Sequence, residues 1–150
     1  MRAGKYAVVG GAAYEASFSR GSDGVMLVVP SRDDRPDGFE WDERYGWTRD
    51  VGWADVERIY EVETWARDAV GYALRVYMPP RNGRVQVVQP PGGGPYDDVP
   101  DGHPAYLVHN TYDREWQGTL PVDELRDARE IEHERDLAAY AEGRPDSPRS

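Results

Sequence analysis

The sequence predicts a mainly β protein made of two tandem SH3-like small β-barrel repeats packed together, with short helical turns and a possible C-terminal helix. Three observations support this fold class. Short β-prone runs recur between glycine-bearing turns. The segment 47–64 aligns without a gap with 116–133, and three of the eighteen pairs are identical, including Trp47 with Trp116. The runs upstream of both segments follow the same order, which is typical of a repeated unit.

Five strands and one helical turn are expected in the first repeat. Tyr14, Ala16 and Phe18 alternate with polar residues, and this period of two indicates a strand with one buried face. The expected strands are 6–9, 14–18, 25–29, 45–51 and 59–66, with a helical turn at 53–58 and a polar loop at 30–43.

The second repeat is expected to contain the same elements in the same order. Its hairpin signal, Arg81-Asn82-Gly83, takes the place of Ser22-Asp23-Gly24 in the first repeat. The expected strands are 71–76, 84–88, 105–109, 115–120 and 129–133, with a helical turn at 122–126 and a longer loop at 90–104.

Two signals conflict in the C-terminal part of the chain. The segment 122–143 has strong helix propensity and no proline, whereas the repeat predicts a strand in its middle. We favour a strand to about His133 and then a helix over 134–142, because tertiary context often overrides propensity. Residues 144–150 are too polar to order themselves and should form a disordered tail. The expected domains are therefore 1–66 and 67–133, followed by a helix and tail over 134–150.

Composition limits the possible functions. The chain has 150 residues, no cysteine and a formal net charge of −10. Affinity for DNA comes from cations that neutralise phosphates, so this charge argues against a nucleic-acid partner and suits a basic protein instead. The plainer interpretation of the charge is solubility. The lack of a long apolar run argues against a membrane span, and the absence of cysteine and of a signal-like N-terminus predicts a cytoplasmic protein.

Three short stretches of the chain are MRAGKYA at 1–7, GFE at 38–40 and DVERIYEV at 55–62. They resemble a set of small uncharacterised actinobacterial proteins made of a doubled β-rich unit. The resemblance extends over most of residues 1–133 and implies a unit that ends in a helical turn and a strand. It implies no known activity, substrate or cofactor, and it therefore assigns no functional residue.

The search for a catalytic pattern gives little. The segment Gly92-Gly93-Gly94-Pro95 follows a strand, as a phosphate loop would, but it lacks the lysine and hydroxyl of such a loop and is followed by acids. The three histidines, His103, His109 and His133, show no spacing typical of a zinc site. We therefore expect a protein that is not an enzyme and that uses no cofactor and no metal.

The most suggestive surface feature is the loop 37–45 (DGFEWDERY), in which three aromatic residues stand among acids. Aromatic side chains are the residue type that anchors interfaces. An equally weighted alternative is that Phe39 and Trp41 fold back onto the core of the first repeat. A second acidic stretch with an aromatic residue lies at 96–98. The candidate partner-binding residues are Phe39, Trp41, Asp42, Glu43, Tyr45, Tyr96, Asp97 and Asp98.

These features predict a non-catalytic, cytoplasmic protein-binding module with an acidic, aromatic-bearing surface for a basic partner. One version is an immunity protein that blocks the cationic active site of a bacterial toxin. The alternative is a small-molecule or metal-dependent enzyme that uses a groove between the two repeats, with Asp101, His103, His109 and Tyr112 as its residues. A module that only mediates self-association is a third possibility.

Overall fold

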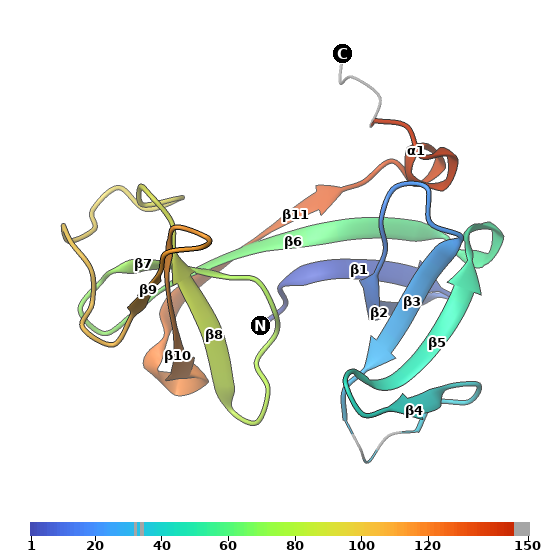
Figure 1. Cartoon of the computed structure of the whole chain (residues 1–150), viewed down its shortest axis with the longest axis horizontal. Helices are drawn as coiled ribbons and strands as arrows, with labels where there is room; N and C mark the ends of the chain where they lie inside the picture. The colour runs from blue at the N-terminus through green and yellow to red at the C-terminus, as the bar shows by residue number, and fades with distance from the viewer. Residues whose placement is uncertain (32, 34, 146–150) are drawn as a thin grey trace. The chain divides into compact units, whose positions relative to one another are not determined.

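The computed structural model describes residues 1–31, 33 and 35–145, and within them the chain is mainly β, as the sequence predicts (Figure 1). The strands are β1 (Gly4–Val9), β2 (Ala12–Ser17), β3 (Gly24–Val29), β4 (Glu40–Asp42), β5 (Gly46–Gly52), β6 (Arg58–Arg67), β7 (Ala73–Val76), β8 (Arg84–Gln89), β9 (Val108–Asn110), β10 (Glu115–Pro121) and β11 (Arg126–Glu134). Two short 3-10 helices, η1 (Trp53–Asp55) and η2 (Val122–Glu124), and one α-helix, α1 (Leu137–Glu142), complete the described elements.

The chain divides into two compact units that are not simple sequence halves. The N unit consists of Lys5–Glu61 and the segment that begins at His133. The C unit consists of Met1–Gly4 and Val62–Glu132. Strands β6 and β11 therefore each contain residues of both units. The division of the chain at residues 66 and 133 that the repeat suggests stays a prediction.

Strand order is similar in the two units. The hydrogen-bonded order is β4-β5-β3-β2-β1-β6 in the N unit. In the C unit it is β9-β10-β8-β7-β6, and β11 also pairs with β6. Raising every strand number of the first order by five gives the second. Strand β6 thus has the last place in the first order and the place of β1 in the second.

The two segments that align in the sequence contain the same elements. Strand β5 has seven residues and is followed directly by η1, and strand β10 has seven residues and is followed directly by η2. Each 3-10 helix is followed by an apolar residue, Val56 or Leu125, whose backbone N–H donates to the carbonyl of the first residue of the helix. Helical turns are therefore present at both predicted places, but each is shorter than expected, because Arg58 and Arg126 already begin the strands that follow.

Tight hairpins form where the sequence places glycine. Gly10 and Gly11 join β1 to β2 with φ values of +60° and +79°. Asn82 and Gly83 lie between the bridged residues Arg81 and Arg84, with φ values of +53° and +74°. Two consecutive positive φ values are the signature of the turn that matches the twist of antiparallel strands. The hairpin expected at Arg81-Asn82-Gly83 is therefore confirmed.

Each unit has its own apolar core. The largest buried side chains of the N-unit core include Phe18, Leu27, Phe39, Ile59 and Tyr140. The C-unit core is aliphatic and consists of Ala3, Leu74, Val76, Val85, Val87, Leu107 and Leu120. A third, small cluster in the C unit contains Trp65, Ala73 and Tyr96, with Val99 packed against it.

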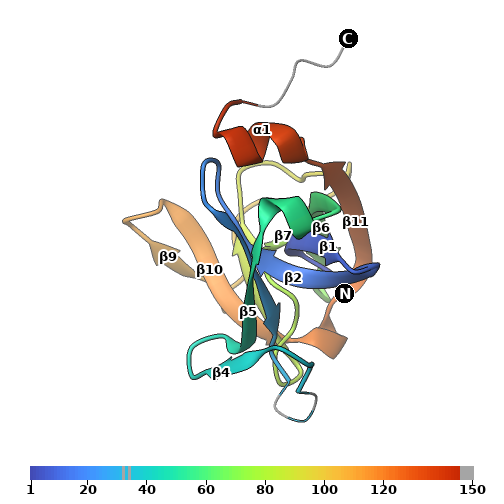
Figure 2. The same cartoon turned by 90° about the vertical axis from the view of Figure 1, so that its right-hand side faces the viewer.

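Strand β11 continues to Glu134 and helix α1 begins at Leu137, so the strand predicted from the repeat is confirmed over the helix predicted from propensity. Asp136 caps the helix through the backbone N–H of Ala139, and Gly143 ends it with a φ of +72°. The helix lies beside the connection between β2 and β3 (Figure 2), where the backbone N–H of Gly21 donates to the carbonyl of Tyr140 at 2.9 Å. Most of the expected disordered tail, residues 146–150, lies outside the described residues.

Two expected elements are placed differently. The predicted loop 30–43 contains strand β4, because Trp41 pairs across the sheet with Trp47. The predicted strand 105–109 begins only at Val108, because the chain forms a turn in which the backbone N–H of Leu107 donates to the carbonyl of Pro104 at 3.2 Å.

Candidate protein-binding surface

Phe39 belongs to the core of the N unit and not to its surface. Its side chain is 2 % exposed and its ring lies 5.7 Å from the ring of Tyr14, measured between centroids. The interpretation of Phe39 as an exposed anchor is therefore corrected in favour of the alternative that the sequence left open. Burying the phenylalanine ring in an apolar core is more favourable than leaving the same ring exposed to water in a polar loop.

The rest of the acidic-aromatic loop forms a compact turn at the end of β4. The Asp42 carboxylate accepts the backbone N–H groups of Arg44 at 2.7 Å and Tyr45 at 3.2 Å. The Glu43 carboxylate accepts the indole N–H of Trp41 at 3.2 Å. Both acids therefore shape the turn, and Tyr45, which is 43 % exposed, is its most accessible aromatic residue.

Tyr96 is also a core residue, at 5 % exposed, whereas Asp97 and Asp98 are exposed. The guanidinium groups of Arg67 and Arg129 lie 4.7 Å and 4.6 Å from its ring centroid, and its hydroxyl donates to the carbonyl of Asp127 at 2.6 Å. Burial raises the pKa of Tyr96. The Tyr96 ring therefore anchors its loop, and only the two following carboxylates are accessible to a partner.

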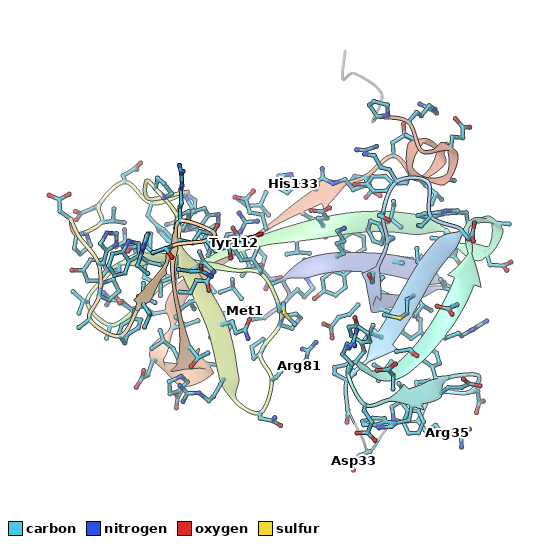
Figure 3. All side chains as sticks on the ribbon, viewed as in Figure 1. Met1, Asp33, Arg35, Arg81, Tyr112 and His133 are labelled. Atoms are coloured by element: carbon cyan, nitrogen blue, oxygen red, sulfur yellow. The ribbon has the colours of Figure 1, made fainter. Side chains whose placement is uncertain are left out.

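Trp47 on β5 is the centre of a small cluster in the N unit. The ring of its cross-strand neighbour Trp41 lies 5.2 Å away at an angle of 74°, and the Arg35 guanidinium lies 5.5 Å from the Trp47 ring centroid. Figure 3 labels Arg35 near β4. Among the residues that the structure describes, the buried indole Nε1 of Trp47 has no hydrogen-bond partner.

Trp116 on β10 has the corresponding neighbours in the C unit. Its cross-strand neighbour on β9 is His109, with ring centroids 5.1 Å apart, and His103 stacks on it at 4.0 Å. His103 lies six residues before His109, as Arg35 lies six residues before Trp41. Both tryptophans pack against the core of their unit, as their equivalence in the alignment suggests.

The residues of the alternative enzyme site are only partly assembled. His103 and His109 both contact Trp116, and His103 also shares a 2.5 Å hydrogen bond with the side-chain oxygen of Gln89. Tyr112 stands on the connection between β9 and β10, 94 % exposed (Figure 3). Over residues 1–31, 33 and 35–145, no three histidine, cysteine, aspartate or glutamate side chains are grouped as a metal ion requires.

The outer face of the N-unit sheet is acidic, a feature that the sequence reading missed. It is the face that points away from the core, and its exposed centre is formed by two cross-strand rows. The first row is Glu15, Val28, Thr48 and Glu40, and the second is Ser17, Met26 and Asp50. Neither row contains a lysine or an arginine. A groove on this face brings Asp23 close to Asp50, Met26 and Ser17.

The sequence signal for this face is weak, because it requires the register of four strands. Glu15, Glu40 and Asp50 are far apart in the sequence and belong to three different strands. Their common face follows only once β2, β3, β5 and β4 are placed in order, and β4 was expected to be loop. We call these three residues with Val28 and Met26 the acidic face.

Asp68 in the C unit is the most deeply buried carboxylate that the structure describes, at 4 % exposed. One of its oxygens accepts the backbone N–H groups of Val70, Gly71 and Tyr72 at 3.1, 2.8 and 2.9 Å. The other accepts the hydroxyl of Tyr106. Burial and this hydrogen bond raise the pKa of Tyr106 above its ordinary value of 10.0. The carboxylate is saturated by local donors and therefore has a structural role in the 68–72 turn.

Comparison with protein-family models, curated proteins and solved structures finds no match to this chain. The resemblance to actinobacterial proteins with a doubled unit therefore stays a prediction. Within the described residues, none of the helices has the length and apolar character needed to cross a bilayer.

Proposed function

We propose that the protein is a non-catalytic binding module that receives a basic protein on the acidic face of its N unit. The observation that carries this proposal is the composition of that face. Carboxylates of Glu15, Glu40 and Asp50 surround the half-buried side chains of Val28 and Met26, with no cationic side chain in the same rows. An apolar centre with a charged rim is the usual anatomy of a protein interface.

Charge on this face would act mainly on the rate and selectivity of association. A net charge of −10 attracts a basic partner over a distance of about one Debye length, roughly 10 Å at 0.1 M salt. Complementary rim charges raise the association rate more than they raise the final affinity. Binding should therefore weaken as the ionic strength rises.

Accessible groups near β4 extend this face. Glu40 is exposed at the edge of the sheet, and the turn that follows it presents Tyr45 beside Glu43. The Arg44 guanidinium of the same turn lies 5.7 Å from the Tyr45 ring centroid, so this ring already has a cation beside it and a basic partner would contact mainly the carboxylates. Asp97 and Asp98 of the C unit are retained as a second set of partner-binding residues.

The strand order supports a duplicated module, in which each copy is an SH3-like barrel. In both units, five strands are followed by a 3-10 turn and then by a strand that pairs with the first of the five, and this recurrence supports the barrel. A cytoplasmic immunity protein that covers the cationic site of a toxin is the version of this function that the acidic face supports best.

The test neutralises the acidic face without changing its shape. The variant Glu15→Gln, Glu40→Gln, Asp50→Asn removes three charges from the face. The matched control, Asp55→Asn, Asp123→Asn, Glu124→Gln, removes three exposed charges from elsewhere. Extract of the source cells is passed over each immobilised protein, and the retained partner is then measured by isothermal titration calorimetry.

The unmodified protein should retain a basic partner at low salt, and the control should bind it with nearly the same affinity. Each exposed charge contributes about 0.2–1 kcal/mol to such a pair, so removing three charges should weaken binding by the face variant roughly 3- to 150-fold. Equal binding by the face variant and the control, or retention that is insensitive to salt, would refute the proposal.

A further inference from the structure

The outer face of the C-unit sheet is neutral, unlike the acidic face of the N unit. Its central row, from β6 to β9, is Trp65, Arg75, Val88, Gln117 and Val108. The loop 90–104 covers the Trp65 end, where Tyr96 packs against Trp65. The other end is open and forms a groove lined by Tyr77, Gln86, Val88, Val108, Gln117 and Thr119, among others. Among the described residues that line it, Glu115 is the only one with a carboxylate, and the Arg75 guanidinium lies 4.8 Å from the ring centroid of Tyr77.

Apolar side chains at this groove are unusually exposed. Val108, on β9, is 72 % exposed, and Tyr77, which directly follows β7, is 46 % exposed. Val108 lies on β9, which is the last strand of the hydrogen-bonded order. Exposed apolar residues along a free strand edge are the pattern that favours pairing with another chain.

The two terminal strands of the sheet order differ in how they are protected. Strand β4 reads Glu40-Trp41-Asp42 and is followed by Glu43, so charged residues flank its tryptophan. Strand β9 reads Val108-His109-Asn110, with neither a carboxylate nor a lysine, arginine or proline. Charges on an edge strand prevent edge-to-edge association, and strand β9 lacks them.

We propose that the groove and the β9 edge of the C unit bind a second copy of this chain. A chain with a net charge of −10 repels its own copy over most of its surface, so two copies associate only where carboxylates are sparse. The groove meets this condition, because its lining is nearly uncharged and its apolar groups are exposed. A basic partner, by contrast, gains nothing from a neutral face when acidic surface is available on the same chain.

The interface is isologous, with the same patch on both copies and a two-fold axis near β9. Antiparallel pairing of two β9 strands would extend the sheet across that axis and bring the two Val108 side chains onto a common face. Each substitution on the patch then acts twice, once from each copy. This symmetry makes a charge introduced at Val108 especially unfavourable.

The experiment is sedimentation velocity on the full chain from micromolar to millimolar concentration. The mass should rise from the monomer value of 17.0 kDa toward twice that value. High salt should strengthen this association, because it screens like charges, whereas it weakens capture of a basic partner. The two salt responses distinguish the homotypic interface from the proposed partner-binding function, and either proposal can fail without the other.

Two variants with the same charge change locate the interface. Val108→Glu introduces two facing carboxylates per dimer and should weaken self-association roughly tenfold or more, which corresponds to about 1.4 kcal/mol or more, because the like charges repel. Val70→Glu is the control, because Val70 is 69 % exposed and lies outside the groove. Circular dichroism checks that both variants are folded. In the unmodified protein, hydrogen exchange at residues 108–110 should slow as the concentration rises.

A chain that stays monomeric at millimolar concentration overturns the inference. Equal loss of association in both valine variants overturns it too, as does exchange at 108–110 that is independent of concentration. Association that appears only with a basic partner present would assign the groove to that partner instead.

Discussion

Individual side chains in this protein show how burial decides between a structural and a surface role. Phe39 and Tyr96 stand in acidic loops, yet both are buried, because an aromatic ring gains free energy by joining a core. Their acidic neighbours remain accessible. Asp68 is the opposite case, a carboxylate that folding removes from water and that four donors then satisfy.

The hydrogen bond from Tyr106 to Asp68 gives a prediction on pH. The pKa of Tyr106 is raised in the folded state, so the stability that this tyrosine contributes is complete below its ordinary pKa of 10.0. It is lost as the pH rises above that value, because the unfolded chain releases the proton more readily. Tyr106→Phe should lower the free energy of unfolding by about 1.5–3 kcal/mol at neutral pH, because it removes a hydrogen bond to a buried carboxylate. The difference between the two proteins should shrink above pH 10.0.

Urea denaturation at a series of pH values measures this difference. Tyr112→Phe is the matched control, because Tyr112 is 94 % exposed. A difference for Tyr106→Phe that stays constant through the alkaline range would show that the hydrogen bond does not carry the effect.

At the scale of elements, close approach between strands explains the glycine positions. Gly24 on β3 pairs directly with Gly52 on β5. A Cβ at Gly24 would lie 2.0 Å from the carbonyl oxygen of Val51, which belongs to the backbone and cannot move away. A Cβ at Gly52 would meet nothing within 4 Å, and the backbone there is extended, with a φ of −68°. The two glycines of this pair should therefore differ in how well they tolerate an added side chain.

Gly24→Ala should lower the free energy of unfolding by more than about 3 kcal/mol, because the clash separates β3 from β5. Gly52→Ala should change it by less than about 1 kcal/mol, and it can even stabilise the protein by reducing the entropy of the unfolded chain. Thermal and urea denaturation of both variants provide the comparison. Similar losses at the two positions would contradict the close approach of the strands.

At the scale of the whole molecule, continuous strands belong to both units. Residues 58–61 of β6 are in the N unit and residues 62–67 are in the C unit, without a break in the strand. Strand β11 is divided in the same way between Glu132 and His133. Unfolding of one unit would therefore also disrupt a strand that continues into the other unit.

We expect a single cooperative unfolding transition as a result. Trp47→Phe and Trp116→Phe each remove one fluorescent reporter, from the N unit and the C unit respectively, so the remaining tryptophans report different mixtures of the two units. The midpoints measured by fluorescence in each variant should agree with the midpoint by circular dichroism in the same variant. Two separate midpoints would show that the units unfold independently.

The amino-acid pattern alone was sufficient for the β class, for most strands, for both helical turns and for the strand at 129–133 against its helix propensity. These features depend on local alternation, on turn residues such as Gly10 and Gly83, and on the internal alignment. All three can be identified from the linear sequence without any tertiary contact. Strand β4 was missed because three residues are too short to show a period.

Only the tertiary structure decided which side chains share a surface. Glu15, Glu40 and Asp50 come together because β4 and β5 pair beside β3, and Val108 is exposed because β9 ends the strand order. Likewise, the residues that share the core with Phe39 lie far from it in the sequence, both before and after it. Burial and common faces depend on contacts between distant segments, and a local pattern carries no information about which segments those are.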